Sequence, residues 1–381
     1  MTERSYDIAV IGAGIAGASV AAELAEYASV LLIEKENHPG YHSTGRSAAM
    51  FIPSYGPVPI QALTKASAAF FNHPPPAFSE TGLLQPRAEL LIARKDQLHT
   101  VEKFLSDTAD GHTGNNAIQR ISASEVMHYC PLLKPGYAAA GVLDTSGSDI
   151  DVHNLHQGYL RTFKQLGGTL VTNSTVHDLK EVAGGWQVQT TTTAITAGTV
   201  VNAAGAWADE LGQMAKAESI GLIAKRRTAM LVEAPDVTNF DSIPLVADID
   251  EAFYIKPEAG RLLLSPANAD PMPPCDVQPE ELDIANCISQ IENAFDFKVD
   301  SIMRKWAGLR SFVKDNSPVA GYSEQANNFF WLAGQGGYGI QSSPALARYA
   351  AALVLQQQIP DDLQQHSLNE NTLSVTRLTG S

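Results

Sequence analysis

Three glycines near the start of the chain follow an apolar segment at the spacing Gly-x-Gly-x-x-Gly. Residues 6–11 predict a strand and residues 18–26 predict a helix. In such a strand–turn–helix unit, Gly12 permits the tight turn, Gly14 lets a pyrophosphate approach the backbone, and Gly17 lets helix and strand pack closely. The positive end of the helix then faces the phosphates. The pattern therefore predicts a bound dinucleotide.

An acidic residue follows this unit at the position where dinucleotide-binding folds use one. Glu34 ends a second apolar run, residues 30–33, about 20 residues beyond the glycines. A carboxylate there can accept hydrogen bonds from both ribose hydroxyls of an adenosine, and it would repel a 2′-phosphate. The sequence therefore predicts an adenine dinucleotide and disfavours NADP.

The composition excludes several classes of protein. The chain has 381 residues, 44% hydrophobic and 18% charged, which is typical of a globular enzyme of two domains or one large composite. The net charge of −15 argues against nucleic acid as a partner. No apolar stretch is long enough for a membrane helix, and no leader precedes the first strand, so we expect a cytoplasmic protein. The three cysteines predict neither a disulfide framework nor a metal site. His42, His153 and His156 have no second metal ligand at a suitable spacing in the sequence.

The elements that must position these residues predict an α/β fold. Nucleotide-binding patterns occur at both ends of the chain and at residues 199–207, with β-rich segments between them. We expect a nucleotide-binding, Rossmann-like domain, residues 1–82, 145–220 and 305–381, interleaved with a β-sheet-based substrate domain, residues 83–144 and 221–304. Helices are expected at 59–73, 95–105, 122–129, 154–166, 280–295 and 344–357, and strands at 90–93, 169–172, 186–190, 229–232, 252–255, 262–264 and 329–333.

Several motifs together resemble the D-amino-acid oxidase-like flavoproteins, a family that includes glycine oxidase and the sarcosine and D-amino-acid dehydrogenases. The motifs are the glycine unit, Glu34, the Asn-Ala-Ala-Gly-Ala-Trp turn at 202–207 and the glycine-rich loop at 334–341. Longer stretches are similar to the bacterial FAD-dependent D-arginine dehydrogenases of that family. They lie at 39–49, 149–151, 155–161, 265–271, 307–312 and 335–341.

The resemblance implies FAD as a tightly bound cofactor and hydride transfer from the substrate Cα to the flavin. The imino acid product would hydrolyse in water to a 2-oxo acid and ammonia. The FAD-binding residues that it implies are Gly12, Gly14, Ala16, Gly17, Glu34, Lys35, Thr44, Arg46, Ser47, Val176, Gly205, Trp207, Gly308, Gly336, Gly337, Tyr338, Gly339 and Ile340.

A carboxylate-bearing substrate needs a fixed cation, and Arg310 is the first candidate because arginine offers a bidentate fork to a carboxylate. We expect Arg310 to lie in a turn beside the two glycine-rich loops. Arg226 and Arg227 are adjacent, so on a strand only one of them faces the site. The resemblance selects Arg227 as the substrate-binding one.

The resemblance also assigns other residues to the site. Tyr254 and Tyr55 are implied as catalytic residues together with Arg310, although a tyrosine in a strand often serves packing alone. Glu89 is implied to meet the cationic end of the substrate. The remaining implied substrate-binding residues are Gly337 and Gln341.

One departure from the family pattern affects the expected substrate. Met50 stands where the related dehydrogenases have an active-site histidine, and Ile52 replaces a nearby threonine. Methionine neither titrates nor donates a hydrogen bond, so the pocket is more apolar and Met50 counts among the substrate-binding candidates. This change favours a drift from arginine towards other D-amino acids.

These observations predict an FAD-dependent D-amino-acid dehydrogenase that favours D-arginine and D-lysine and passes electrons to an acceptor that the sequence does not identify. One alternative is an oxidase of glycine, sarcosine or another small amine. A second, from another class, is a non-catalytic flavin-binding redox sensor. A nicotinamide dehydrogenase is disfavoured, because the loop at 334–341 suits a cofactor with an isoalloxazine end.

Overall fold

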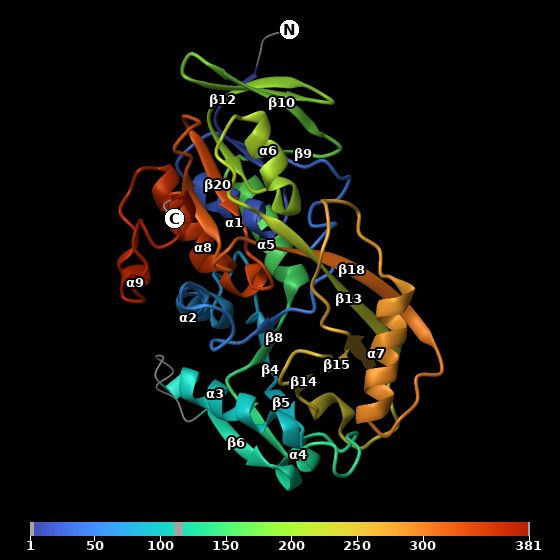
Figure 1. Cartoon of the computed structure of the whole chain (residues 1–381). Helices are drawn as coiled ribbons and strands as arrows, with labels where there is room; N and C mark the ends of the chain where they lie inside the picture. Colours follow the sequence, from blue (N-terminus) through green and yellow to red (C-terminus); the bar gives the residue numbers. More distant parts are fainter. Residues whose placement is uncertain (1–3, 110–116, 380–381) are drawn as a thin grey trace.

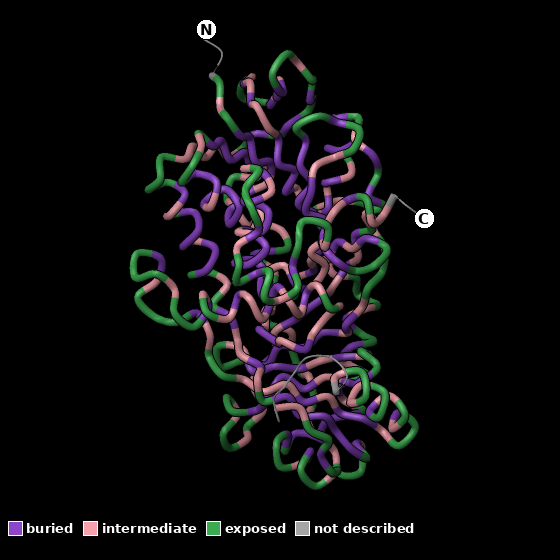
Figure 2. The backbone as a smooth tube through the Cα atoms, turned by 90° about the vertical axis from the view of Figure 1, so that its left-hand side faces the viewer, coloured by how far each residue is buried: buried purple, intermediate pink, exposed green. Residues whose placement is uncertain are grey.

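Two large sheets, one in each half of the molecule, organise the chain in the computed structural model (Figure 1). The structure describes residues 4–109 and 117–379. The described part of the chain begins in the half built on the first sheet. Buried backbone runs through the interior of both halves, and exposed segments lie mostly at the periphery (Figure 2). The predicted α/β class is confirmed.

The first sheet contains the predicted dinucleotide unit. Its described strands follow the order β10-β11-β12-β1-β2-β9, and β20 pairs with both β12 and β19. Strand β1 runs parallel to β12 and β2, with Ile11 beside Asn202 and Ile33. Parallel strands buried on both faces need continuous apolar runs, which explains the sequence pattern. The bounds are β1 Arg4–Ile11, β2 Val30–Ile33, β9 Thr169–Val171, β10 Val176–Val182, β11 Gly185–Thr190, β12 Ala194–Asn202, β19 Val319–Tyr322 and β20 Phe329–Ala333.

Helices cover both faces of this sheet. Ile8 and Val10 pack into a core with α1 (Ile15–Leu24), α5 (Val152–Gln165) and α8 (Gly339–Val354), and α2 (Val58–Asn72) packs against α8. On the opposite face, Ala9 and Ile11 contribute to a core that includes residues of α6 (Ala208–Met214). The predicted helices at 59–73 and 154–166 are confirmed within two residues at each end.

The last predicted helix begins earlier than expected. We predicted 344–357, but α8 starts at Gly339 and contains Pro344. Two hydroxyl groups compensate for the proline. Ser343 Oγ donates to the Ile340 carbonyl, and Ser67 Oγ accepts from the Ala345 amide. The glycine-rich loop therefore runs directly into a helix, as the first one does.

The second sheet follows the order β17-β13-β16-β15-β14-β5-β7-β6, with β18 on the free side of β13. One of its faces packs on α7 (Glu281–Ala294) and α4 (Ala123–Tyr129), and α3 (Leu98–Ala109) lies against β6 and β7. The bounds are β5 Glu89–Ala93, β6 Ile118–Ser122, β7 Ala140–Asp144, β13 Ile223–Glu233, β14 Leu245–Asp248, β15 Tyr254–Glu258, β16 Arg261–Ser265, β17 Asp270–Pro271 and β18 Ile302–Phe312.

Strand β18 changes two expectations. It pairs with β13 along its length, from Ile302 beside Val232 to Phe312 beside Ile223. Arg310 therefore lies within a strand, and the predicted turn at this residue is wrong. The domain boundary that we placed between residues 304 and 305 falls inside the same strand. The pairing with β13 keeps the segment extended although glycine and polar residues interrupt its apolar pattern.

A small third sheet lies between the two halves, with the order β3-β8-β4. Asp149 on β8 forms ion pairs with Arg87 and with the buried Lys256 of β15. Within the described residues, no helix is long and apolar enough to span a membrane. The remaining elements are β3 Met50–Phe51, β4 Leu84–Pro86, β8 Ser148–Ile150, α9 Asp361–Gln364, α10 Thr376–Thr379 and the 3-10 helices η1 Lys95–Gln97, η2 Gly205–Trp207 and η3 Phe240–Ser242.

Candidate active site

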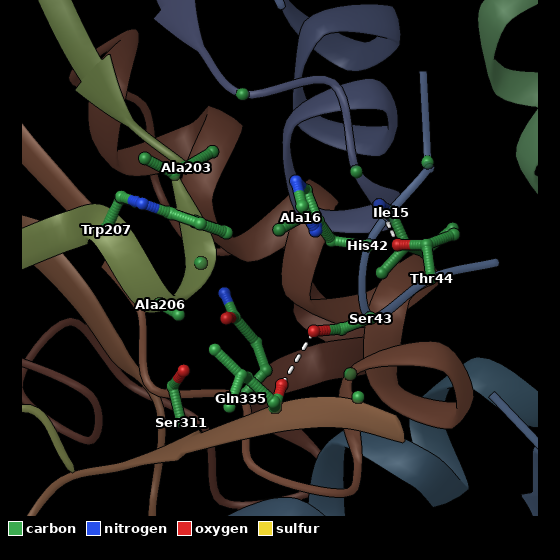
Figure 3. Close-up of a pocket in the computed structure, with 18 of the residues that line it drawn as sticks. Ile15, Ala16, His42, Ser43, Thr44, Ala203, Ala206, Trp207, Ser311 and Gln335 are labelled. Carbon is green, nitrogen blue, oxygen red and sulfur yellow. Dashed lines mark hydrogen bonds between the residues drawn. The ribbon is translucent and has the colours of Figure 1, made fainter. Parts of the chain in front are cut away.

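A long cavity lies where the carboxyl ends of the first sheet meet strands β13, β15 and β18 of the second sheet. Segments that are far apart in the sequence line it, and Figure 3 shows part of this lining. Its predicted members are Gly12, Gly14, Ala16, Glu34, Lys35, Thr44, Arg46, Ser47, Val176, Gly205, Trp207, Arg227, Tyr254, Gly308, Arg310, Gly336, Gly337, Gly339 and Ile340.

Two glycines of the first glycine turn, Gly12 and Gly17, have no room for a Cβ atom. Gly12 has a φ of +100°, and a Cβ there would lie 2.5 Å from the Ala203 carbonyl oxygen. A Cβ on Gly17 would lie 1.7 Å from the Gly12 carbonyl oxygen. Both clashes involve backbone atoms, which cannot move without separating helix α1 from strands β1 and β12. Gly17 itself does not line the cavity; it permits the close packing behind it.

Side chains hold the same turn from the cavity side. The buried Glu34 accepts hydrogen bonds from the backbone amides of Ala13 and Glu36, each at 2.9 Å. Thr44 Oγ1 accepts from the Ile15 amide at 2.9 Å (Figure 3). Each carboxylate oxygen of Glu34 can accept more than one hydrogen bond, so these contacts leave capacity for a ribose.

Lys35, His42 and Trp207 gather near Glu34. The Lys35 ammonium lies 3.1 Å from the centre of the Trp207 ring, and the His42 ring centre lies 4.7 Å from it. His42 Nε2 lies 2.8 Å from a carboxylate oxygen of Glu36. Burial lowers the pKa of both Lys35 and His42. This end of the cavity therefore offers an aromatic ring and a cation beside the Glu34 carboxylate, which we expect to bind the ribose.

Arg46 lines the cavity, but its guanidinium group is engaged elsewhere. It donates to the carbonyls of Val277 and Ala307 and pairs with Asp276. In the same loop, Ser43 Oγ donates to the Leu309 carbonyl at 2.6 Å (Figure 3). These bonds fasten the loop at residues 40–48 to β18, so Arg46 organises the wall of the cavity with its charged group turned to the protein.

The second glycine loop borders the arginine end. Gly336 has a φ of +56°, and a Cβ on Gly337 would lie 3.0 Å from Arg310 Nη1. Within the described residues, Gln335 Nε2 and Arg227 Nε are buried without a hydrogen-bond partner, and both residues line the cavity. Such atoms are costly unless a ligand pairs with them. A groove bordered by two glycine loops, with an acidic end and unpaired donors, fits a dinucleotide with a polar ring system.

Strand register brings the substrate candidates to one face of the second sheet. Arg227 lies beside Gly308, and Arg310 follows two residues later, so both guanidinium groups share that face. Tyr254 also lines the cavity. Burial, and then the like charge of Arg310, lower the pKa of Arg227. Two adjacent cations in a buried site favour an anionic ligand such as a carboxylate.

The neighbouring Arg226 faces the other way. Arg226 is 4% exposed, and its guanidinium group pairs with Asp283, Asp270 and Glu280. The alternation of side chains along β13 thus separates a structural arginine from one with an unpartnered Nε in the cavity. The choice between the two that the sequence left open is resolved in favour of Arg227 as the cavity residue.

Six predicted site residues do not line the cavity: Gly17, Met50, Tyr55, Glu89, Tyr338 and Gln341. The Tyr55 ring packs 4.9 Å from the Tyr338 ring. Burial raises the pKa of Tyr55, whereas the charge of Arg310 lowers it. Gln341 accepts from the Ile52 amide, and its Nε2 is buried without a partner in the described part of the chain. Tyr55 and Tyr338 therefore lie near enough to Arg310 for its charge to act on both hydroxyl groups.

Glu89 shares a sheet face with Tyr254, because Leu91 and Tyr254 both pair with Ala247 and Glu89 stands two residues before Leu91. Burial raises its pKa to about 8, and the negative charges of Asp144 and Glu251 add to the effect. Without a cationic ligand, Glu89 is therefore mostly protonated at neutral pH. The sequence prediction treated it as a carboxylate.

Sequence reasoning missed several residues of this region. Gln335 lies within the glycine-rich loop at residues 334–341, so the sequence pattern already pointed to its position. Ser174 and Ser311 also line the cavity, but neither occurs in a diagnostic pattern. Glu251 lies in an acidic turn with φ +59°, and its charge acts on Tyr55, Glu89 and Arg227. Within the described residues, no cluster of ligands suits a metal ion.

The chain is similar to known flavoenzymes over most of its length. Glycine oxidase of Geobacillus kaustophilus is 24% identical, covering 97% of this chain and 98% of the relative. Its crystal structure superposes with a TM-score of 0.80 at 22% identity, covering 98% and 99% of the two chains. Mitochondrial dimethylglycine dehydrogenase of Rattus norvegicus is 23% identical over 93% of this chain, which spans 43% of that longer relative.

A further solved structure carries the cofactor. L-α-Glycerophosphate oxidase from Mycoplasma pneumoniae, with FAD bound, matches with a TM-score of 0.83 at 18% identity and covers 92% of this chain and 95% of that one. The FAD dependent oxidoreductase family matches residues 7–353. The chain therefore belongs to the FAD dependent oxidoreductase family, and FAD is its cofactor.

Proposed function

We propose that the protein catalyses the FAD-dependent oxidative deamination of D-amino acids and favours D-arginine and D-lysine. The observation that carries this proposal is the pair of arginines, Arg227 and Arg310, at the end of a cavity that suits FAD. Glu89 lies on the same sheet face as Tyr254 and supplies a group for a cationic side chain.

Each half of the molecule has its own task in this proposal. The first sheet, with residues 1–82, 145–220 and part of 305–381, holds FAD, and the second sheet supplies the substrate wall. Because β18 belongs wholly to the second sheet, we assign its residues 305–312 to the substrate half. The junction of the sheets then becomes the place of reaction.

The two arginines bind the substrate α-carboxylate. A guanidinium fork holds a planar carboxylate in one orientation, and such positioning lowers the barrier of the following step. FAD held by the first sheet would supply the two-electron oxidant for hydride transfer from the substrate Cα, which the arginines orient towards it. The substrate amine loses a proton in the same overall reaction, and water converts the released imino acid to a 2-oxo acid and ammonia.

Tyr254 and Tyr55 orient the reacting end of the substrate. Tyr254 lines the cavity beside the arginines, and its hydroxyl is suited to hydrogen-bond a carboxylate or an amine. The raised pKa of Tyr55 keeps its hydroxyl protonated, so it acts as a hydrogen-bond donor or packing group and does not serve as a base at neutral pH. Gly337 lets Arg310 approach the loop closely.

A second candidate is an oxidase of glycine, sarcosine or another small amine. Two observations favour it: the similarity to a glycine oxidase and the raised pKa of Glu89, which leaves that residue largely uncharged at neutral pH. A neutral Glu89 and the apolar Met50 would suit a substrate without a charged side chain. In this reading the same arginines still bind the carboxylate.

Anaerobic reduction of the holoprotein separates these candidates. We would add D-arginine, D-lysine, D-methionine, D-leucine, glycine and sarcosine in turn and follow the loss of oxidised-flavin absorbance. Fastest reduction by D-arginine and D-lysine supports the proposal, and preference for glycine or sarcosine supports the second candidate. Failure of every substrate to reduce the flavin would contradict both and favour a non-catalytic flavoprotein.

A further inference from the structure

A buried histidine on α5 contacts the first glycine turn, although it is not among the residues that line the cavity. His156 is 4% exposed, and its Nε2 lies 2.9 Å from the Ala13 carbonyl oxygen. A carbonyl only accepts hydrogen bonds, so Nε2 must carry the proton. Burial lowers the pKa of His156, which favours the neutral ring.

Both backbone polar groups of Ala13 are therefore hydrogen-bonded to side chains. Its amide donates to Glu34 Oε2 at 2.9 Å, and its carbonyl accepts from His156. One residue beyond Gly14, the Ile15 amide donates to Thr44. Three side chains from three separate segments thus fix consecutive peptide groups of a turn that consists mainly of glycine and alanine.

The same imidazole ring supports the loop that carries Thr44. A Cβ on Gly40 would lie 2.9 Å from His156 Cε1 and 3.2 Å from Nδ1, so the backbone of this loop rests against the ring. The Gly45 amide donates to the Gly40 carbonyl at 2.7 Å and closes the loop. His156 therefore contacts both segments that supply backbone to this part of the cavity.

Peptide geometry links the histidine to the cofactor. The Ala13 carbonyl and the Gly14 amide belong to one planar trans peptide, in which C=O and N–H point in opposite directions. Gly14 lines the cavity and His156 does not. When His156 holds the carbonyl, the Gly14 N–H is turned away from the histidine, towards the cavity.

We propose that His156 is a positioning residue for FAD: it holds the Ala13 carbonyl so that the Gly14 amide is aimed at the FAD phosphates. Its effect on the cofactor passes through this one peptide plane. The donor at Nε2 is the property that matters, and the proposal is independent of which amine or amino acid the enzyme oxidises.

Two polar substitutions test the role of this donor. Glutamine places an N–H donor the same number of bonds from Cα as His156 Nε2, whereas asparagine places it one bond short. We would titrate FAD into full-length apoprotein of wild type, His156→Gln and His156→Asn, and measure the dissociation constant from flavin fluorescence. His153→Asn, an exposed position on the same helix, is the matched control.

His156→Asn should weaken FAD binding about 5- to 150-fold, the range for a buried carbonyl left unpaired at ~1–3 kcal/mol. His156→Gln and His153→Asn should bind FAD within about threefold of wild type. Thermal unfolding of each apoprotein reports folding separately. Equal losses in the Gln and Asn variants, or unchanged affinity in Asn, would overturn the proposal. If the Asn apoprotein is unfolded, His156→Leu takes its place in the same comparison.

Discussion

The two ends of the cavity are built in different ways. At the dinucleotide end, Gly12, Gly14 and Gly17 lie within six residues of one another, and backbone geometry determines what fits. At the arginine end, Arg227, Tyr254 and Arg310 from three strands of the second sheet line the cavity, and Glu89 of a fourth strand shares the sheet face of Tyr254. A backbone site has few permitted substitutions. A wall of side chains can be altered one residue at a time, so in the proposed function this end sets the identity of the substrate.

The first prediction tests the backbone end. Gly17→Ala places a Cβ 1.7 Å from the Gly12 carbonyl oxygen, so helix α1 must move away from the turn. We expect the affinity for FAD to fall by a factor of ~100 or more, since overpacking of this kind costs about 3 kcal/mol. The measurement is the flavin-to-protein ratio of the purified protein.

The control for this substitution is Gly321→Ala in β19, where the nearest atom to an added Cβ lies 3.5 Å away. This variant should retain FAD fully. A Gly17→Ala protein with a full complement of FAD would show that the close contact between helix and turn is dispensable.

The next effect concerns the arginine end. Arg310→Met removes the guanidinium that we propose holds the substrate carboxylate, and kcat/KM should fall by a factor of ~30 to ~5,000, from about 2–5 kcal/mol for a buried charge contact. Arg310→Lys should restore little, because lysine lacks the bidentate fork. Steady-state kinetics with the best substrate of the panel measure the loss.

Arg304→Met, an exposed arginine of the same strand, is the matched control and should keep near-normal kcat/KM. FAD content should remain unchanged in both variants, since the two ends of the cavity are constructed separately. Near-normal kcat/KM in Arg310→Met would disprove the proposed role of this residue.

A smaller effect is expected from Glu89→Leu. A charged hydrogen bond contributes about 1.5–3 kcal/mol, so kcat/KM for D-arginine and D-lysine should fall ~10- to ~150-fold. D-Methionine and D-leucine should be nearly unaffected, because they have no cation to bind. The comparison of all four substrates on both proteins is the test, and equal losses would mean that Glu89 has only a structural role.

The smallest effect is a pH dependence with a defined sign. The pKa of Glu89 is raised to about 8, so the carboxylate forms as pH rises through that value. The ratio of kcat/KM for D-arginine to that for D-leucine should therefore increase by up to ~10-fold between about pH 7 and pH 9. Both substrates share the α-amine, which cancels from the ratio. In Glu89→Gln the ratio should be flat, and a slope that persists there would assign it to another group.

The contrast between the two ends also decides how far the sequence could be interpreted. The glycine turn, the helix after it and Glu34 were predictable because the pattern that identifies them lies within one strand–turn–helix–strand unit, although distant residues such as Thr44 and His156 also contact the turn. Arg310 was placed in a turn, because the pairing of β18 with β13 joins segments about 80 residues apart and leaves no local pattern. The start of α8 was missed because the hydroxyls that compensate for Pro344 include Ser67 of a different helix.

By itself, the sequence determined the cofactor class, the α/β fold and the chemical types available at the site. Only the tertiary structure decided that Arg227 faces the cavity while Arg226 is paired, that Glu89 has a raised pKa, and that His156 contacts the first turn. The physical reason is the range of the interactions. Turn geometry and hydrophobic periodicity act between near neighbours, whereas burial, strand register and the field of distant charges exist only once the two sheets have come together.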